Sequence, residues 1–315
     1  MASSTALAPS ARPARDLPLS NYKMSERSRH GDFGIRDERT ALPNPAAHRH
    51  EYLQIHVQLA GETQHAIGDA RRAVTPGTVC FILPYKTHFI PTVPGSRYYI
   101  LNASLGYLLP SLDVDALDLQ DLPIERAPEL APFRFQEQLD FRLNGAALAQ
   151  VEGLCREIAA EDQRRANGSA ILIRAYLLQL IGLVWREHGE ALAALAAMPA
   201  SGQARNPALT RLRAFLKDRL DQPVSLTDAA AATHLSPTYL AHLLKRETGQ
   251  TFVEYLTARR MSLARELLLH TSLSVKEIAF RCGFSDEAYF GRRFRLLEQA
   301  SPTAFRRQLR QPGSC

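Results

Sequence analysis

Cysteine is scarce in this chain. The 315 residues contain four cysteines that lie far apart, namely Cys80, Cys155, Cys282 and Cys315. No pair has the Cys-x-x-Cys spacing of a metal or redox site, and the wide spacing suggests no disulfide framework. The cysteine content therefore excludes a small disulfide-stapled secreted domain and predicts a protein of the reducing cytoplasm.

Long apolar runs are also absent. The most apolar late stretch, residues 171–185, is interrupted by Arg174 and Gln179 and is too short to span a bilayer. The first twenty residues are rich in Ala, Pro, Ser and Arg but have no continuous apolar core, unlike a secretory signal. We therefore expect no membrane-spanning segment and no membrane partner, and we expect residues 1–30 to form a flexible arm.

Acidic residues balance the basic ones in only one part of the chain. The formal charge of +6 divides into +7 for residues 207–315 and −1 for residues 1–206. A basic excess confined to one region is typical of a domain that binds a polyanion, and a merely solvated basic surface is the plain alternative. A chain of 315 residues also exceeds one comfortable domain, so we expect two.

Strand patterns fill the first part of the chain. Residues 52–59 alternate between polar and apolar side chains, which is typical of a half-buried strand. Turn signals separate this strand from further short strands at residues 79–83 and 97–101. The pattern predicts a small antiparallel barrel or sandwich. Residues 106–132 carry no clear pattern.

Two helices are expected next. Residues 146–160 and 169–187 place apolar side chains at helical spacing. These helices either pack on the barrel or form a dimerisation surface, and the pattern does not choose between the two. The first domain would then span residues 31–188, and residues 189–206, rich in alanine and broken by proline and glycine, are expected to be a linker.

The last third of the chain contains one pattern twice, with an offset of 49 residues before a turn and 50 after it. In the first copy Ser225 can cap a short helix, and Ser236 can cap a second helix with Pro237 at its first position, where a missing amide hydrogen costs nothing. In the second copy Ser285 or Asp286 is the corresponding cap. The repeat predicts two helix-turn-helix units within an all-helical domain, residues 207–315.

The second helix of each unit has an inward and an outward face. The inward residues are expected to be Leu240, Leu243 and Leu244 in the first unit, and Phe290, Phe294 and Leu297 in the second. The outward residues expected to read DNA bases are Pro237, Thr238, Ala241, His242, Glu287, Ala288, Gly291 and Arg292. Those expected to contact phosphates, which fix position rather than sequence, are Lys245, Arg246, Arg293 and Arg295. Arg292 can make a bidentate contact with guanine, Glu287 can accept from a cytosine amine, and Gly291 allows close backbone approach.

A single helix is expected between the two units, over residues 252–269. A rod of this length can hold two recognition helices about 34 Å apart, the separation of successive major grooves on one face of the duplex. One subunit would then read two adjacent grooves of double-stranded DNA. An all-helical repeat that only contacts proteins is the alternative, but it requires charge, caps and spacing to coincide by chance.

These residues resemble a known family. The motifs Ile278-Ala279, Gly283-Phe284-Ser285, Tyr289-Phe290 and Ser301-Pro302 are similar to those of the AraC/XylS transcription regulators. The resemblance implies an amino-terminal cupin-like effector domain, a homodimer on repeated operator half-sites, and activation together with RNA polymerase. One position departs from the family pattern, because Gln299 stands where a glycine usually follows the second recognition helix.

The amino-terminal part resembles the cupin barrel of these regulators more loosely. The residues expected to bind the effector are His48, His50, Tyr52, Gln54, His88, Arg97 and Tyr99. The histidines would donate hydrogen bonds, Arg97 would pair with a carboxylate, and the tyrosines would form aromatic walls. Metal-binding cupins usually have a glutamate shortly after the His-x-His motif, and the neutral Gln54 is a poor replacement for an anionic ligand. We therefore expect no metal and no cofactor, and a small polar or anionic effector.

The sequence thus predicts an α+β chain that acts in the cytoplasm as a ligand-responsive transcription regulator, not as an enzyme. In the mechanism that the resemblance implies, effector binding changes how the arm or the dimer helices hold the DNA-binding domains. Two alternatives remain. One is a cupin-type metalloenzyme fused to a DNA-binding domain, and the other is an effector-independent repressor with a purely structural barrel.

Overall fold

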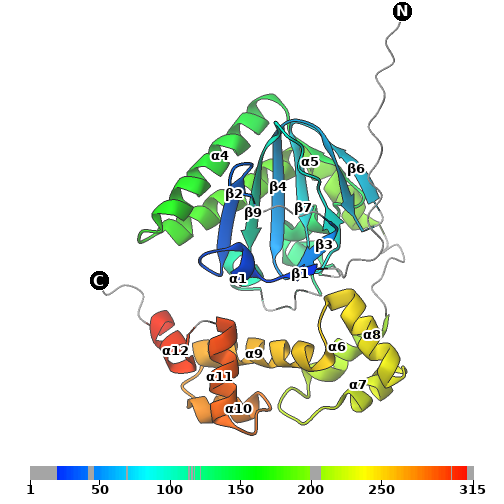
Figure 1. Ribbon diagram of the computed structural model, residues 1–315, viewed down its shortest axis with the longest axis vertical. Coiled ribbons are helices and arrows are strands. Elements are labelled where there is room, and N and C mark those ends of the chain that lie inside the picture. The colour runs from blue at the N-terminus through cyan, green and yellow to red at the C-terminus, as the bar shows by residue number, and fades with distance from the viewer. Residues whose placement is uncertain are drawn as a thin grey trace, which may run out of the picture. The chain divides into compact units, whose positions relative to one another are not determined.

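The computed structural model describes every residue except 1–19, 42–45, 69, 113, 115, 117, 121, 199–206, 299 and 311–315. The chain forms two compact units, Met1–Pro199 and Ala200–Cys315. In Figure 1 the first unit runs from blue to green and the second from yellow-green to red. The first unit is built on β-strands with helices, and the described part of the second consists of helices and loops. The predicted α+β fold is confirmed.

Two five-stranded sheets form the frame of the amino-terminal unit. One has the order β1-β3-β8-β5-β6, with strands β1 (Ser20–Tyr22), β3 (His48–His50), β8 (His88–Phe89), β5 (Thr63–Ile67) and β6 (Ala70–Val74). The other has the order β10-β7-β4-β9-β2, with strands β10 (Phe141–Arg142), β7 (Thr78–Ile82), β4 (Leu53–Ala60), β9 (Arg97–Ala103) and β2 (Phe33–Asp37). Strand β1 pairs with β3 in parallel, and the other pairs are antiparallel. The three predicted strands correspond to β4, β7 and β9.

The alternation of β4 separates a core face from a polar face. Leu53, Ile55 and Val57 are buried in the main hydrophobic core of the unit. The intervening Gln54 and His56 point to the other side of the sheet and are buried as well. Buried polar side chains require hydrogen-bond partners or a ligand. The polar face of β4 therefore marks the candidate pocket.

Two long helices, α4 (Gly145–Arg164) and α5 (Ser169–Ala197), cover the core face and contribute apolar side chains to the core (Figure 1). By length and composition alone, α5 is the one helix among the described residues that could cross a membrane, and core helices of soluble proteins have the same character. The prediction that the linker starts at residue 189 is wrong. Because alanine favours helix and Leu192 is fully buried in the core, α5 continues through Ala197.

Part of the predicted flexible arm is ordered. Residues 1–19 lie outside the described part, but β1 and the short helix α1 (Met24–Arg27) fall within residues 1–30. The Tyr22 ring meets His48 edge-on at 5.3 Å between centroids, and the Arg27 guanidinium lies 3.7 Å from the centre of the Tyr22 ring. The arm prediction is therefore wrong for residues 20–27. Local composition could not reveal these contacts, since they depend on pairing with β3.

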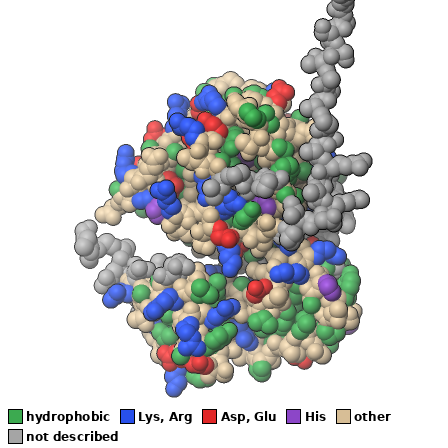
Figure 2. Space-filling model, viewed as in Figure 1, with side chains coloured by type: hydrophobic (Ala, Val, Ile, Leu, Met, Phe, Trp, Pro, Cys, Tyr) green, Lys and Arg blue, Asp and Glu red, His purple; other side chains and the backbone are tan. Residues whose placement is uncertain are grey.

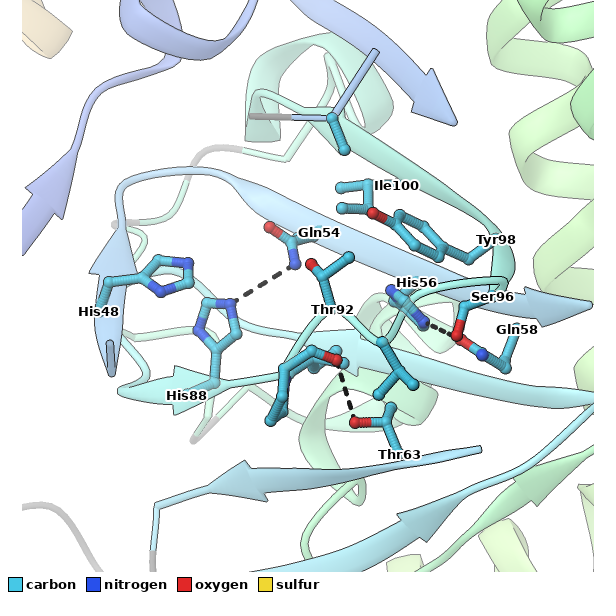
Figure 3. A pocket seen from close by; sticks show the side chains of 14 residues that line it. His48, Gln54, His56, Gln58, Thr63, His88, Thr92, Ser96, Tyr98 and Ile100 are labelled. Carbon is cyan, nitrogen blue, oxygen red and sulfur yellow. Dashed lines mark hydrogen bonds between the residues drawn. The ribbon is translucent and has the colours of Figure 1, made fainter. Parts of the chain in front are cut away.

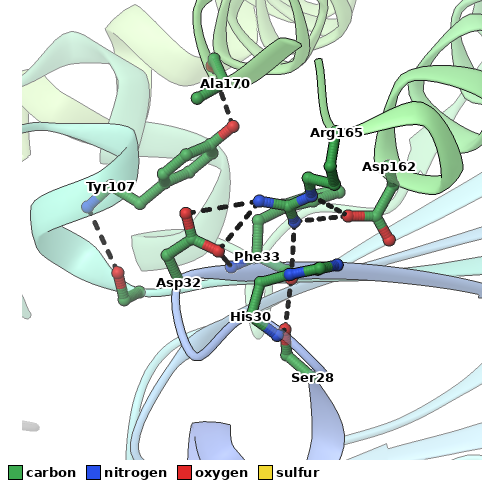
Figure 4. Close-up of polar contacts among 9 residues, drawn as sticks. Ser28, His30, Asp32, Phe33, Tyr107, Asp162, Arg165 and Ala170 are labelled. Carbon is green, nitrogen blue, oxygen red and sulfur yellow. Dashed lines mark hydrogen bonds and ion pairs between the residues drawn. The ribbon is translucent and has the colours of Figure 1, made fainter. Parts of the chain in front are cut away.

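Arg165 fastens the turn between α4 and α5 to the start of β2 (Figure 4). It ends α4 in the left-handed conformation, with φ 44°. Its guanidinium donates from Nε to Asp162 Oδ1 (2.9 Å), from Nη1 to Asp32 Oδ1 (3.2 Å) and from Nη2 to the Phe33 carbonyl (3.1 Å). Beside it, the Tyr107 hydroxyl donates to the Ala170 carbonyl at 2.8 Å. The helix pair is thus joined to the edge of the sheet through side-chain contacts. The remaining short elements of this unit are α2 (Leu105–Leu108), two 3₁₀ turns (Ile124–Arg126 and Pro128–Leu130) and α3 (Ala131–Arg134).

The carboxy-terminal unit contains two helical modules. Its helices are α6 (Pro207–Lys217), α7 (Leu226–Thr233), α8 (Pro237–Thr248), α9 (Phe252–His270), α10 (Val275–Arg281), α11 (Glu287–Glu298) and α12 (Pro302–Arg310). Figure 1 shows α9 between a module of α6 to α8 and a module of α10 to α12. The pairs α7–α8 and α10–α11 are the two predicted helix-turn-helix units. The predicted connecting helix over residues 252–269 is α9.

The predicted caps are confirmed, and the structure resolves the choice between Ser285 and Asp286. Ser236 Oγ accepts from the amide of Tyr239 at 3.2 Å. In the second helix-turn-helix unit, Asp286 Oδ1 accepts from the amide of Ala288 at 2.8 Å, so Asp286 caps α11. Reciprocal capping boxes also start both preceding helices, through Ser225 with Asp228 and Ser274 with Glu277. Local hydrogen bonding thus fixes where each helix begins.

One inward assignment is wrong. Leu240, Leu243, Leu244, Phe290 and Phe294 are buried as predicted. Leu297 is instead 43% exposed. At this last turn of α11 the inward position belongs to Glu298, whose Oε1 pairs with Arg265 Nη1 of α9 at 2.7 Å. The stripe of α11 rotates by one residue there, so Leu297 faces solvent.

Candidate DNA interface and effector pocket

The first recognition helix, α8, presents its predicted polar face to solvent. Pro237, Thr238, His242 and Lys245 are exposed, and Ala241 is partly exposed. Because Ser236 and Pro237 fix the start of the helix, these side chains form one outward stripe opposite the buried leucines. The predicted base-reading side of α8 is therefore exposed or partly exposed to solvent.

The second recognition helix, α11, shows the same division. Glu287, Ala288, Arg292 and Arg295 are exposed, and Gly291 is partly exposed. Ala288, Gly291, Arg292 and Arg295 line one hollow together with Leu296, Ser301 and Pro302 at the start of α12. On the face in Figure 2, several Lys and Arg side chains lie over α10 to α12, and others lie over the amino-terminal unit. This stripe therefore combines a concave surface with positive charge.

Two of the predicted phosphate contacts have other surroundings than expected. Arg246 pairs with Glu247 at 2.8 Å, and the hydrogen bond that Arg246 donates to the Glu247 carboxylate raises the pKa of this arginine. Arg293 is only partly exposed, and its Nε is buried without a hydrogen-bond partner among the described residues. Arg295 is exposed beside the hollow. Arg295 is thus the more exposed of these two arginines.

Three further exposed residues on these helices were not among the predicted DNA contacts. Tyr239 and Tyr289 occupy the same position in the two units and are 49% and 44% exposed. Leu296 is 63% exposed on the stripe of Arg292. The recurrence of a tyrosine at an offset of 50 residues was the signal that could have identified the pair.

Arg260 of α9 joins the two modules. Its Nε donates to the Leu220 carbonyl at 2.9 Å and its Nη2 to the Gln222 carbonyl at 2.6 Å, both in the loop that follows α6. Its guanidinium also lies 5.7 Å from the Phe284 ring, in the turn of the second unit. Gly283 in that turn adopts φ +73°, and a side chain there would collide with the Leu220 carbonyl. Within the carboxy-terminal unit, the turn between α10 and α11 thus packs directly against the loop between α6 and α7.

A pocket lies on the polar face of β4 (Figure 3). It is lined by residues of both sheets, of the loop after β8 and of the segment after β2, namely Ala41, His48, Gln54, His56, Gln58, Thr63, His88, Ile90, Pro91, Thr92, Val93, Ser96, Tyr98 and Ile100. Of the predicted residues, His48, Gln54 and His88 meet at one end. The His48 and His88 rings are 4.3 Å apart between centroids, and Gln54 Nε2 lies 3.5 Å from His88 Nε2.

His50 and Tyr52 lie behind this wall and do not line the pocket. Their rings stack at 4.2 Å between centroids with 4° between planes, and His50 Nδ1 donates to the Tyr52 carbonyl at 2.7 Å. The His50 ring also meets His88 edge-on at 4.8 Å. These two residues therefore pack behind the pocket wall. They do not continue the wall because β3 ends at His50 and the chain bends before β4 begins.

Arg97 and Tyr99 lie on the wrong side of the sheet for the predicted role. Tyr99 pairs with Val57 in the register of β4 and β9, so it shares the core face. Arg97 Nη2 pairs with Glu152 of α4 at 2.9 Å. The intervening residues Tyr98 and Ile100 line the pocket instead. The prediction therefore assigned the two faces of this strand the wrong way round. Arg97 does not line the pocket and supplies no positive charge to it.

Burial keeps the histidines of this region uncharged. It lowers the pKa of His56 to about 4, and burial together with the neighbouring His48 lowers that of His50 to about 3. Burial also lowers the pKa values of His65 and His88. At neutral pH each of these rings is therefore a neutral imidazole with one N–H and one lone pair.

The pocket is narrow. Its open space is about 30 Å³, which is close to the volume of one water molecule. The loop after β8 contributes Ile90, Pro91, Thr92, Val93 and Ser96 to its wall. No group of three or more His, Cys, Asp or Glu side chains in the described part of the chain is arranged to hold a metal ion.

Known proteins match both units. The family described as "AraC-like ligand binding domain" matches residues 38–181, and the family described as "Helix-turn-helix domain" matches residues 229–308. The chain is 26% identical over 267 residues to the HTH-type transcriptional activator RhaR of Mannheimia succiniciproducens, which covers 82% of this chain and 86% of the relative. It is 28% identical over 281 residues to the activator RhaS of Klebsiella pneumoniae, which covers 84% and 89%. A solved AraC-type regulator structure from Chromobacterium violaceum is 32% identical, covers 34% of this chain and 96% of its own, and has a TM-score of 0.33.

Proposed function

The chain belongs to the AraC family of transcription regulators, and from this premise we propose that it activates transcription by reading two successive major grooves with α8 and α11. It is an effector-responsive, DNA-binding regulator. The observation that supports the groove-reading proposal is that corresponding outward positions stand exposed or partly exposed in both helices. These positions are Thr238 and Ala288, Ala241 and Gly291, and His242 and Arg292.

The carboxy-terminal unit alone tests DNA binding. We expect a fragment of residues 207–315 to bind DNA from the promoter of its own gene with strong salt dependence. About four phosphate contacts correspond to a log-log slope of about −3.6, or roughly a 100-fold loss of affinity between 50 and 200 mM salt. Electrophoretic mobility or fluorescence anisotropy titrations measure this slope. Affinity that does not change with salt would contradict the proposal.

Two single substitutions separate base reading from phosphate contact. Arg292→Ala is expected to weaken binding by roughly 1 to 3 kcal/mol and to relax preference at one base pair, because a bidentate guanine contact is lost. Lys245→Ala is expected to weaken all sequences about equally and to reduce the salt slope by about one. Binding to a randomised operator library measures both effects. Equal losses on every sequence for both variants would show that the roles are wrongly assigned.

We infer that the protein acts in the cytoplasm as a homodimer that contacts RNA polymerase. Two adjacent apolar side chains at the start of α5, Ile171 and Leu172, are 67% and 42% exposed, which supports a protein contact on this helix. The names of the relatives as activators support a contact with the polymerase.

We propose that the effector binds in the pocket of the amino-terminal unit. The pocket combines buried polar side chains of β4 with the aromatic Tyr98 and an irregular loop after β8. His48, Gln54 and His88 are the predicted residues that remain candidates for direct contact. His50 and Tyr52 would act by holding them in place.

A further inference from the structure

The hollow beside the second recognition helix combines an apolar wall with positive charge. Ala288, Arg292 and Leu296 line it from one face of α11, since they are spaced by four residues. The buried Pro302 lines it from the start of α12, and the exposed Arg295 lies on the same wall. Among the described residues that line this hollow, none is Asp or Glu. The hollow therefore suits a ligand that is apolar in one part and negatively charged in another.

The two adjacent leucines of α11 have different surroundings. Both are exposed, but Leu296 lines the hollow and Leu297 does not. A single exposed leucine is ordinary on a protein surface. Leu296 differs because it forms one apolar surface with Ala288 and Pro302. The hollow has about 590 Å³ of open space, which is within the range of sites that hold whole ligand groups.

The place of Leu296 along α11 determines which part of the DNA it can meet. In helix-turn-helix proteins the first residues of the recognition helix contact the base edges. Because a helix rises by about 1.5 Å per residue, Leu296 lies about 6 Å beyond Arg292 and about 12 Å beyond Ala288 along the axis. The major groove is only about 12 Å wide. Leu296 therefore reaches the sugar and phosphate at the edge of the groove rather than the bases in its floor.

We propose that this hollow holds the DNA backbone at the edge of the groove that α11 enters, with Leu296 packed against a deoxyribose and Arg295 paired with the adjacent phosphate. The proposal rests on the proposed function, in which α11 reads that groove. The carbon atoms of the sugar supply an apolar surface for Leu296 and Pro302, and the phosphate supplies the charge that fits Arg295. Leu296 is thus a positioning residue, which holds α11 in the groove on every sequence and reads no base.

DNA binding by the full-length protein tests this assignment. The probes are duplexes selected from a randomised library, together with the same duplexes changed at single base pairs. Leu296→Ala should weaken binding to every duplex about 5- to 10-fold, because the burial of about half a leucine side chain is lost. The log-log salt slope should stay the same, since no phosphate contact is lost. Leu296→Met keeps the apolar volume and should bind within about twofold of the unsubstituted protein.

Two further variants complete the test. Leu297→Ala is the matched control, because it removes the same side chain one position away from the hollow, and it should leave DNA affinity unchanged. Arg295→Ala should reduce the salt slope by about one. Neutral methylphosphonates placed at single positions then locate the phosphate, since one of them should weaken the unsubstituted protein and leave Arg295→Ala unaffected. All of these side chains are exposed, so urea unfolding should give the same midpoint for each variant.

The possible failures are distinct. A loss from Leu296→Ala that is confined to duplexes with one thymine, and that disappears when uracil replaces it, would show a methyl contact to a base and overturn the proposal. Unchanged DNA affinity of Leu296→Ala, with or without weaker self-association, overturns it as well. In both cases the unsubstituted protein still binds DNA, so the proposed function stands. If the unsubstituted protein shows no salt-dependent affinity for any duplex, the proposed function fails and the proposal fails with it.

Discussion

At pH 5 we expect the amino-terminal unit to be less stable than at pH 7.5 by about 4 kcal/mol or more. His50 and His56 are almost completely buried, at 0% and 3% exposure. Burial lowers the pKa of His50 to about 3 and that of His56 to about 4. In the unfolded chain both rings titrate near pH 6.5. Between these pH values the two rings therefore bind protons in the unfolded chain but stay neutral in the folded unit.

The sign follows from proton linkage. Below pH 6.5 the unfolded state holds more protons than the folded state, so acid favours unfolding. Each of the two histidines contributes about 2 kcal/mol to this loss between pH 7.5 and pH 5. Burial lowers the pKa values of His65 and His88 as well, which adds to the effect in the same direction. Since a domain is stable by only about 5 to 15 kcal/mol, this loss is a large share of the stability of the unit.

Urea titrations at the two pH values measure the loss. Trp185 reports on this unit because it lies in α5, where its Nε1 donates to the Pro128 carbonyl at 2.8 Å. His56→Gln should reduce the difference between the two pH values by about 2 kcal/mol, whatever it does to stability at pH 7.5. The matched control is His30→Gln, since His30 is an exposed histidine of the same unit. Equal stability at pH 5 and pH 7.5 would show that the buried rings are accessible to protons in the folded state.

The helical unit could be predicted from the sequence because its information is local. Ser236 caps its helix through an atom three residues from the amide it accepts from, so the residue types alone announce the helix start. The helical spacing of Leu240, Leu243 and Leu244 likewise predicts the buried face of α8 without information from other segments. The prediction failed at Leu297, where a contact between α9 and α11 decides the outcome. Arg265 draws Glu298 inward, and the sequence gives no sign of that pair.

The pocket was less predictable because strand pairing is not local. Residues 97–101 carry large side chains at successive positions, so the pattern itself does not say which face Tyr99 occupies. Its pairing with Val57 decides this, and the register shifts between Gln58 and Ala60. The bend after His50 is a second such case, since it sends the residues on either side of it into different sheets. A one-residue change of register moves every side chain to the other face.

Gly283→Ala is expected to destabilise the carboxy-terminal unit by about 2 to 4 kcal/mol. Gly283 has φ +73°, a left-handed conformation that alanine adopts only with strain. Its new methyl group would also collide with the Leu220 carbonyl and lie 2.6 Å from Nη2 of Arg260. Because Leu220 belongs to the first module, the damage falls on the contact between modules as well as on the turn.

The contact between the modules at Arg260 should also affect DNA binding, and this effect can be measured separately from stability. If the joint at Arg260 sets the spacing of α8 and α11, loosening it should weaken binding to an operator with both half-sites more than binding to either half-site alone. Arg260→Lys is the milder probe, since an ammonium group cannot reproduce the forked bonds to the Leu220 and Gln222 carbonyls. Urea unfolding and titration of whole and half operators measure the two effects side by side.

Gly291→Ala is the matched control for the glycine substitution. Gly291 lies in the helix α11, and an added side-chain carbon there meets nothing within 4 Å. This change should leave the unit as stable or raise its stability by up to about 1 kcal/mol, because alanine is the better helix former. It should still weaken DNA binding if the backbone approaches the groove at this position. Equal loss on whole and half operators for Arg260→Lys would mean that α9 alone, without the joint, holds the two recognition helices in register.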